Sequence, residues 1–269
     1  MRASPTHFTF LFFWALFVVA GVLVVTWRLR DVPVDPHFFD WHAPEPEGAT
    51  GSLGAPVAVS ATGTGKPAAV VPPPAPIMAK PLPAHAQLAV PFQPQAPFAS
   101  WKLPYREACE EASAIMAAAF FNKETLSAKR MDARILEAVA WEKRVLGAYL
   151  DTDAAQTARI LREHLGMSGT TVQYDFTVDD VKRAIVAGNP VIILVAGREI
   201  GNPHYVPPAP VYHALVITGF TGSLFITNDP GTKFGKGYAY EAAVLLKASH
   251  EWNAKDIDLG RPAIVVVAP

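Results

Sequence analysis

Residues 212–230 read YHALVITGFTGSLFITNDP and contain the pattern that decides the fold. Two apolar runs, YHALVITGF and SLFITN, flank the dipeptide Thr221-Gly222. Apolar runs on either side of such a turn signal predict an antiparallel hairpin. A turn at this point sets His213 opposite residues 229–231, which begin with Asp229. The predicted hairpin therefore brings an imidazole close to a carboxylate.

Segments on both sides of this hairpin predict helices first and strands afterwards. In residues 107–121, EACEEASAIMAAAFF, apolar side chains recur at three- and four-residue steps, as on one face of a helix. Thr177 and Asp180 form the pattern of a capping box, and the apolar run VIILVA that follows is typical of a buried strand. Further predicted helices span about residues 127–150, 152–165 and 240–249, and a last strand spans 262–268. This order of elements indicates an α+β fold.

The first 30 residues have the composition of a membrane anchor. Residues 8–27 read FTFLFFWALFVVAGVLVVTW, an uncharged run of 20 residues, and about 20 apolar residues are what an α-helix needs to cross a bilayer. The run ends at Trp27 and is followed by Arg28, Leu29 and Arg30, where a signal peptide would have small residues for cleavage. We therefore predict a transmembrane helix within residues 1–30, with a cleaved signal peptide as the alternative. We expect the rest of the chain on the extracytoplasmic side of the cell membrane.

Residues 31–88 have the composition of a disordered linker. They combine Pro-rich pieces such as VPPPAPIMAKPLP with the stretch GATGSLGAPVAVSATGTGK, and large apolar side chains are too few there to form a core. Dense aromatic and aliphatic residues begin after residue 88. The remaining residues, 89–269, are numerous enough to bury a core without help. We predict one domain over this range.

The composition of the whole chain excludes several classes of function. The formal net charge is -1, and no dense cluster of lysine and arginine is present, so nucleic acid is not an expected partner. Cys109 is the single cysteine, which excludes an intramolecular disulfide and a zinc site built from several cysteines. We expect neither a cofactor nor a metal. The expected partners are a peptide or protein substrate and, through the N-terminal helix, the membrane.

Cys109 lies in the predicted first turn of a helix, which is a position that favours a thiolate. Glu110 and Glu111 follow directly, and their negative charges oppose ionisation of the thiol. Acidic residues also suit the first turn of any helix. A free cysteine is among the most buried residue types, so an inert core cysteine is the alternative to a nucleophile.

His213 and Asp229 supply the groups that a thiol nucleophile needs. A carboxylate that accepts from one ring nitrogen fixes the tautomer of a histidine and leaves its other nitrogen free to act as a base. Asp229 also fits an ordinary turn in the sequence N-D-P-G. Asn228 is a substitute orienting residue, but neighbouring strand residues point to opposite faces, so only one of the two can meet His213. We predict that Asp229 does.

Acyl transfer also needs donors for the developing oxyanion. The backbone N–H of Cys109 is one candidate, and an upstream side-chain amide is the other. Gln95 is the first choice for that amide and Gln93 the second, with ordinary loop polarity as the alternative for both.

Four segments resemble, in order, the motifs of the C39-like peptidase family within the papain-like superfamily: VPFQPQAPFASW, YREACEEASAIM, YHALVITGF and FITNDPGT. The resemblance covers nearly all of residues 89–269. It implies a papain-like cysteine peptidase fold in which Gln95 completes the oxyanion hole, Cys109 attacks, His213 shuttles the proton and Asp229 orients the histidine. Many members carry Gly-Pro directly after the cysteine, whereas this chain has two glutamates.

Taken together, these patterns predict a membrane-anchored extracytoplasmic cysteine peptidase. The same residues would support transpeptidation or amide transfer if an amine replaced water as the acceptor. A third hypothesis is a catalytically silent peptide-binding module on a tether, because the two glutamates after the cysteine oppose its ionisation.

Overall fold

The computed structural model of the protein describes residues 81–269. Seven strands form one sheet in the order β2-β7-β3-β4-β5-β6, with β1 paired to β4, and every pairing is antiparallel. The strands are β1 (His85–Gln87), β2 (Thr171–Tyr174), β3 (Val191–Ala196), β4 (Tyr212–Thr221), β5 (Leu224–Asn228), β6 (Lys236–Glu241) and β7 (Ala263–Val266). Because helices precede most of the strands, the predicted α+β class is confirmed.

The central strand β3 contributes side chains to two hydrophobic cores, one on each face of the sheet. All six of its residues are buried. Ile192 and Leu194 belong to one hydrophobic core, and Ile193 and Val195 belong to the other. Successive side chains of a strand point to opposite faces of the sheet, so the uninterrupted sequence VIILVA fits a strand that is covered on both sides.

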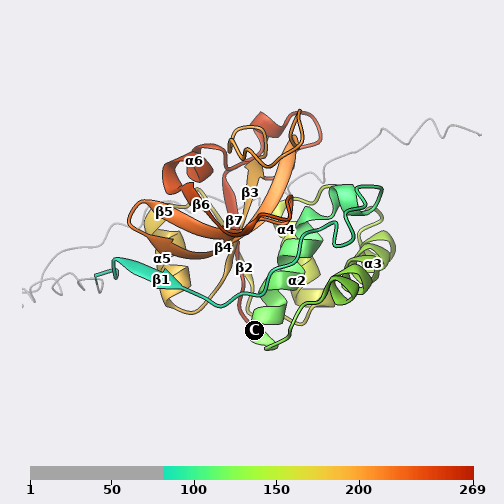
Figure 1. Cartoon of the computed structure of the whole chain (residues 1–269), viewed down its shortest axis with the longest axis horizontal. Helices are drawn as coiled ribbons and strands as arrows, with labels where there is room; N and C mark the ends of the chain where they lie inside the picture. Colours follow the sequence, from blue (N-terminus) through green and yellow to red (C-terminus); the bar gives the residue numbers. More distant parts are fainter. Residues whose placement is uncertain (1–80) are drawn as a thin grey trace, which may run out of the picture. The chain divides into compact units, whose positions relative to one another are not determined.

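Helices cover both faces of this sheet (Figure 1). The first core holds residues of α2, α3 and α4, and the second holds residues of α5 and α6. The helices are α2 (Cys109–Phe121), α3 (Ala128–Val145), α4 (Ala154–Arg159), α5 (Val178–Val186) and α6 (Ala242–Lys247). Short turns of 3-10 helix span Tyr105–Glu107 and Ile257–Leu259, and a π-helical turn spans Ile160–His164.

Helix α2 differs from the expected helix with one apolar face. Its first eleven residues, 109–119, are all buried. Ser113 and the many alanines make this possible, because small side chains let α2 contact the sheet and α3 closely. Glu110 and Glu111, expected to suit an ordinary first turn, are therefore enclosed with the rest of the helix.

Local signals in the sequence set the ends of several helices. The predicted capping box of Thr177 and Asp180 is confirmed at the start of α5. The predicted helix over 152–165 is instead divided into α4 and the π-helical turn, and Asp153 and Gln156 form an unpredicted capping box. Gly166, with φ of +76°, follows the end of this segment, a conformation that glycine adopts without strain.

Three short strands were not predicted. β1 lies in the last part of the expected linker, which therefore ends before residue 88, because His85–Gln87 pair with β4 through the backbone. β2 and β6 lack long apolar runs, and tertiary pairing with β7 and β5 makes them strands. The predicted transmembrane helix and most of the linker lie outside the described residues. No helix in 81–269 has the length and apolar character needed to cross a membrane.

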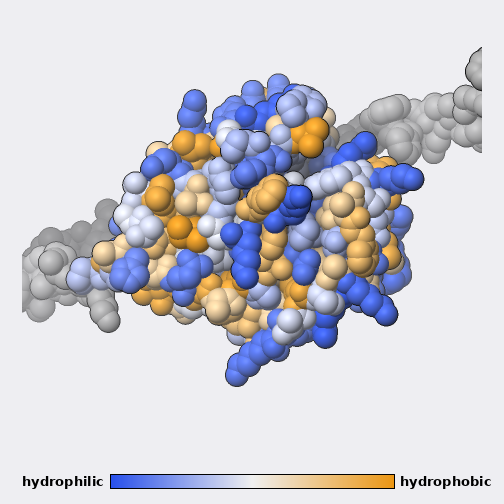
Figure 2. All heavy atoms as spheres, in the orientation of Figure 1, coloured by the Kyte–Doolittle hydropathy of each residue, from blue (hydrophilic) through white to orange (hydrophobic). Residues whose placement is uncertain are grey.

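The surface of the described residues mixes polar and apolar groups. Figure 2 shows hydrophobic side chains in small groups, separated by hydrophilic ones, on the face seen in Figure 1. Singly exposed apolar residues of this kind are ordinary on protein surfaces.

Candidate active site

Cys109, His213 and Gln95 line one cavity of about 820 Å³. Cys109 is the first residue of α2, and His213 is the second residue of β4. Ser113 Oγ of α2 donates to the carbonyl oxygen of Ala214 at 3.2 Å, which fixes this helix against the start of β4. The fold thus brings a thiol and an imidazole to the same cavity from distant parts of the sequence.

The hairpin positions His213 against Asp229. Val216 pairs with Asn228 at the end of the β4–β5 ladder, so Asp229 lies just beyond the last pair. His213 Nε2 and Asp229 Oδ1 are 2.8 Å apart, and both residues are buried. The contact that the sequence predicted between these two residues is therefore present.

Asp229 is fully buried and accepts five hydrogen bonds. Its Oδ1 accepts from His213 Nε2 and from Gly231 N at 2.9 Å. Its Oδ2 accepts from Asn202 Nδ2 at 3.0 Å, Tyr205 Oη at 2.6 Å and Tyr240 Oη at 2.7 Å. Burial alone would raise the pKa of Asp229, but the charge of His213 and these hydrogen bonds lower it to about 2. The site therefore holds a carboxylate rather than a carboxylic acid.

Sequence reasoning did not find the residues that hold Asp229 on its second oxygen. Asn202 and Tyr205 belong to the Pro-containing loop 201–210 between β3 and β4, where no sequence pattern assigned a contact. Tyr240 lies on the unpredicted strand β6. The Pro-containing loop was the available signal for the first two, whereas nothing in the sequence near Tyr240 indicates a site.

Gly231 packs directly against this group. A Cβ added there would lie 2.9 Å from His213 Cε1, 3.0 Å from Tyr205 Cε1 and 3.2 Å from Asp229 Oδ1. We expect Gly231→Ala to displace the imidazole and to lower kcat by about tenfold or more, as measured in a peptide-cleavage assay. Gly188→Ala, after α5 and outside the cavity lining, is the control for a general loss of stability, because its φ of +90° strains alanine without any contact with the site. Unchanged kcat in Gly231→Ala would mean that the ring position tolerates displacement.

Neither of the two second-choice candidates, Asn228 and Gln93, lines the cavity. Asn228 Nδ2 donates to Val90 O at 3.0 Å, so Asn228 ties the N-terminal segment to β5 and does not orient His213. Gln93 Nε2 donates to Leu126 O at 2.9 Å, and Gln93 does not line the cavity. The alternation of strand side chains thus separates Asn228 from Asp229, as the sequence predicted.

Gln95 lines the cavity but does not offer a free amide hydrogen in this structure. Its Nε2 donates to Tyr105 O at 2.9 Å and to Arg106 O at 3.1 Å. Its Oε1 is buried, with no hydrogen-bond partner among the described residues. Gln95 N also donates to Pro230 O at 3.0 Å, which holds this segment beside Asp229. An oxyanion role requires the amide to release one of its two carbonyl acceptors.

The Cys109 thiol makes its side-chain hydrogen bond with a carboxylate. Sγ donates to Glu110 Oε2 at 2.9 Å, and among the described residues no hydrogen bond joins Sγ to His213. Burial raises the pKa of the Cys109 thiol, and Glu110 raises it further. The expectation that all three side chains meet within hydrogen-bonding reach therefore holds for His213 and Asp229 alone. In this structure the thiol hydrogen is directed at Glu110 instead.

Gln95, Cys109, His213 and Asp229 all lie in a segment that matches a known protein family. A model of the Peptidase C39 like family matches residues 87–256, more than half of the chain. The chain belongs to the peptidase C39-like family. A solved chain from Bacillus anthracis that is described as C39-like shares 14% identity with a TM-score of 0.46, and the match covers 69% of this chain and 98% of that chain. The comparison with curated proteins gave no match.

The wall of the cavity in this C39-like domain is largely apolar. Loop 201–210 supplies much of one side of this wall. Four large apolar side chains that line the cavity stay partly exposed: Trp101, Val206, Val211 and Phe234. A hollow of this size, with exposed apolar walls and a few polar groups at one end, is typical of a binding cleft.

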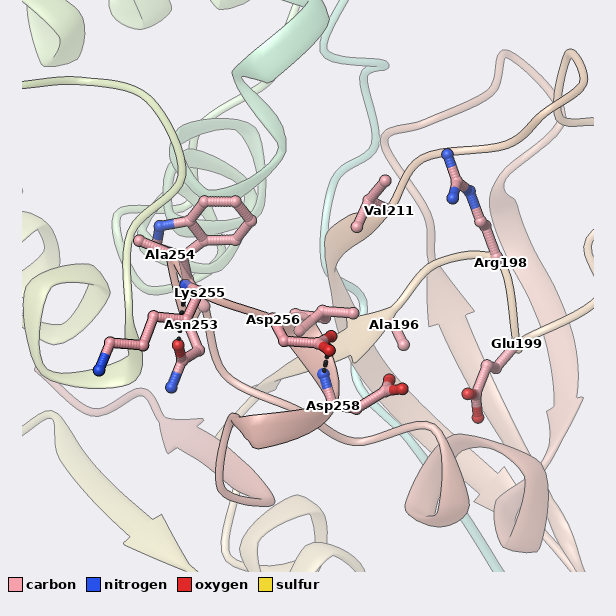
Figure 3. Close-up of a pocket in the computed structure, with 11 residues that line it drawn as sticks. Ala196, Arg198, Glu199, Val211, Asn253, Ala254, Lys255, Asp256 and Asp258 are labelled. Atoms are coloured by element: carbon pink, nitrogen blue, oxygen red, sulfur yellow. Dashed lines mark hydrogen bonds between the residues drawn. The ribbon is translucent and has the colours of Figure 1, made fainter.

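A smaller hollow of about 430 Å³ adjoins this cleft, and both share Val211 and Trp252. Charged side chains rim it, with Arg198 and Glu199 from one loop and Lys255, Asp256 and Asp258 from another (Figure 3). Neither Cys109 nor His213 lines it. The smaller hollow is therefore a neighbouring site with a charged rim, separate from the catalytic candidates.

Three carboxyl groups, two from α2 and one from α3, are buried in this C39-like domain. Glu110, Glu111 and Glu142 are each about 1% exposed or less. Burial raises the pKa of Glu111 strongly, and the neighbouring charges of Glu142 and Glu110 raise it further. Burial also raises the pKa of Glu142 to about 8, and its carboxyl group lies within hydrogen-bonding reach of the Glu111 carboxyl. Two adjacent buried carboxyls favour sharing of a proton over double ionisation.

This cluster makes the stability of the fold depend on pH. Because folding raises the pKa of Glu142 from 4.5 to about 8, its contribution is complete below about pH 4.5 and is lost as the pH rises toward 8. We expect Glu142→Gln to remove this loss, which is on the order of 3–5 kcal/mol. Thermal unfolding from about pH 5 to pH 9 would show a higher Tm for the variant at the alkaline end.

The exposed Glu137 of the same helix provides the matched control for this prediction. Glu137→Gln removes the same charge from α3 without changing the buried cluster, so the pH dependence of its Tm should match that of the parent. A parallel decline of Tm in Glu142→Gln and the parent would contradict the assignment of this dependence to Glu142.

Proposed function

We propose that this C39-like domain is a cysteine peptidase that hydrolyses peptide bonds with Cys109 as nucleophile, His213 as general base and Asp229 as orienting carboxylate. The observation that carries the proposal is the buried His213–Asp229 pair, which lies at the cavity that Cys109 also lines. Membership of the peptidase C39-like family supports the same reaction class.

The hydrogen bond to Asp229 gives His213 a defined role. Nε2 carries the hydrogen that Asp229 accepts, so Nδ1 is the nitrogen that can take the thiol proton. Cys109 Sγ then forms a bond to the substrate carbonyl carbon, and the imidazolium returns its proton to the leaving amine. Water attacks the resulting thioester and releases the second product, with His213 again as the base.

Two groups are proposed to bind the oxyanion. The backbone N–H of Cys109 lies at the start of α2, where helix N–H groups lack intrahelical acceptors. The Gln95 amide lines the same cavity and can contribute once one of its hydrogens leaves the carbonyl of Tyr105 or Arg106. Preorganised donors of this type lower the barrier by several kcal/mol, about 2.7–4 for one donor.

The cavity supports a polypeptide substrate. Its exposed apolar wall suits bulky apolar side chains near the scissile bond, and the charged hollow beyond Val211 suits polar residues further along the chain. We place this peptidase domain outside the cytoplasm, joined by the Pro/Gly-rich linker to a transmembrane anchor. Its substrates would then be peptides or proteins at the outer side of the membrane.

A peptide-cleavage screen with the full chain tests this function. Peptides that vary in apolar and charged residues are incubated with the protein, and products are identified by mass spectrometry. A peptidyl chloromethyl ketone of a cleaved sequence should label Cys109, and labelling should be lost in His213→Ala. Neither cleavage nor labelling across the peptide set would contradict the proposal.

The same screen separates the alternatives. An added amine that is incorporated into the product would identify a transpeptidase or amide-transferring enzyme with the same three residues. The Cys109–Glu110 hydrogen bond favours a second candidate, a catalytically silent peptide-binding module, because it holds the thiol in its neutral form. Peptide binding without either product would identify that module.

A further inference from the structure

Glu110 contacts the Cys109 thiol and a backbone amide at the same time. Its Oε2 accepts from Cys109 Sγ at 2.9 Å. Its Oε1 accepts from Thr152 N at 2.6 Å and from Thr152 Oγ1 at 3.2 Å. Glu110 is 1% exposed, so water does not compete for these bonds. The carboxylate is therefore held in place on one oxygen while the other faces the thiol.

The residue that holds Glu110 is itself fixed by neighbouring elements. Tyr212 Oη, from β4, donates to Thr152 O at 2.6 Å. Thr152 Oγ1 and Thr157 Oγ1, the latter from α4, are 2.9 Å apart. Because three elements meet at Thr152, Glu110 cannot turn away from the thiol without breaking buried hydrogen bonds.

The other titratable groups around Glu110 are acidic or phenolic. Glu111 lies on the same helix, Glu142 comes from α3, Asp151 comes from the loop before α4, and Tyr212 comes from β4. No lysine or arginine in residues 81–269 forms an ion pair with these four carboxyl groups. Burial raises the pKa of Glu110, while its hydrogen bonds to Cys109 and Thr152 lower it. No lysine or arginine among the described residues is thus paired with this cluster, and the imidazole of His213, at the same cavity, is the group left to stabilise a negative charge on sulfur.

From this geometry we propose that Glu110 is a positioning residue that holds Cys109 as a neutral thiol in the resting protein and so limits its reactivity. The inference rests on the proposed role of Cys109 as nucleophile. It adds a control of that nucleophile by the glutamate that directly follows it in the sequence.

Activation of the thiol moves one proton from sulfur to the imidazole. In the resting form, the proton stays on Sγ and Glu110 is a carboxylate that accepts it in a hydrogen bond. In the reactive form, the S–H bond breaks, the proton forms a bond to His213 Nδ1, and both electrons of the S–H bond stay on sulfur. A thiolate beside the Glu110 carboxylate would place two negative charges at hydrogen-bond distance, which opposes the second form.

Glu110→Gln separates this role from a structural one. The amide oxygen of glutamine can still accept from Thr152 N, so the support of the loop before α4 is preserved. The amide nitrogen faces Sγ and can donate a hydrogen bond to it, which favours the thiolate. The substitution therefore reverses the effect on the thiol with little change in shape.

The test is the pH dependence of thiol alkylation by iodoacetamide in the full chain, where Cys109 is the single cysteine. We expect the Glu110→Gln variant to react about tenfold faster than the parent near pH 6.5, with its alkylation profile shifted by about one pH unit toward acid. Glu111→Gln is the matched control, because it removes the next carboxyl group without removing the partner of Sγ. Its profile should lie close to that of the parent.

Equal alkylation profiles in Glu110→Gln and the parent would overturn the inference, and so would equal acceleration in both glutamine variants. If Glu110→Gln does not fold, the parent still provides a test. Alkylation of the parent near pH 6.5 at or above the rate of a free cysteine peptide would also overturn the inference. The measurement needs no substrate. Faster alkylation of Glu110→Gln without any peptide cleavage would therefore support the inference while the proposed function failed.

Discussion

Replacing Asp229 with alanine is expected to lower kcat for peptide cleavage by about 10²–10⁴-fold, because His213 loses the group that sets its tautomer and orientation. The same change leaves donors from five residues without their acceptor in a buried site. Breaking a buried pair in this way costs about 3–5 kcal/mol. The measurements are kcat against a cleaved peptide and the free energy of unfolding in denaturant.

Asp229→Asn is the matched variant that separates orientation from charge. Asparagine can keep an oxygen toward His213 Nε2, and the hydroxyl groups of Tyr205 and Tyr240 can rotate to accept from its amide nitrogen. We expect a smaller loss of kcat and of stability than in Asp229→Ala. If Asp229→Ala kept the activity of the parent, the assignment of Asp229 as the orienting residue would be wrong.

The two variants should also differ from the parent in how their stability depends on pH below about pH 5. Folding lowers the pKa of Asp229 from 3.8 to about 2, so its contribution is present above about pH 4 and is lost as the pH falls toward 2. The shift corresponds to about 2 kcal/mol. The free energy of unfolding should therefore change less between about pH 2 and pH 5 for Asp229→Asn than for the parent.

Replacing Cys109 with serine is expected to lower peptide cleavage by a factor of about 10³ or more. The hydroxyl group ionises far less readily than the thiol, and Glu110 and the burial of this position oppose an anion further. Both side chains are small, so the α2 contacts with β4 should persist. The measurement is kcat/KM with the peptide that the parent cleaves best.

Binding provides the control for the serine variant. The apolar wall of the cavity does not include the nucleophile, so the serine variant should still bind the uncleaved peptide. When cleavage by the parent is slow relative to dissociation of the peptide, the Kd of the variant should lie within about threefold of the parent's KM. Cleavage at the rate of the parent would exclude Cys109 as the nucleophile. Loss of peptide binding together with cleavage would point to a disturbed cavity instead.

The sequence by itself determined the elements whose signals are local. The hairpin of β4 and β5, the buried run of β3 and the capping box at Thr177 follow from alternation, turn residues and hydrogen bonding within a few positions. The approach of His213 to Asp229 follows as well, because the length of a hairpin fixes which residues oppose each other. These features need no knowledge of the rest of the chain.

Tertiary structure alone decided the partners that come from distant segments. Tyr240 reaches Asp229 because β6 pairs with β5, and Thr152 reaches Glu110 because the loop before α4 packs on the start of α2. The thiol donates to Glu110, whose carboxylate is buried at the start of α2, so water does not compete for this hydrogen bond. Such contacts depend on packing between elements, and the periodicity of a single element carries no information about them.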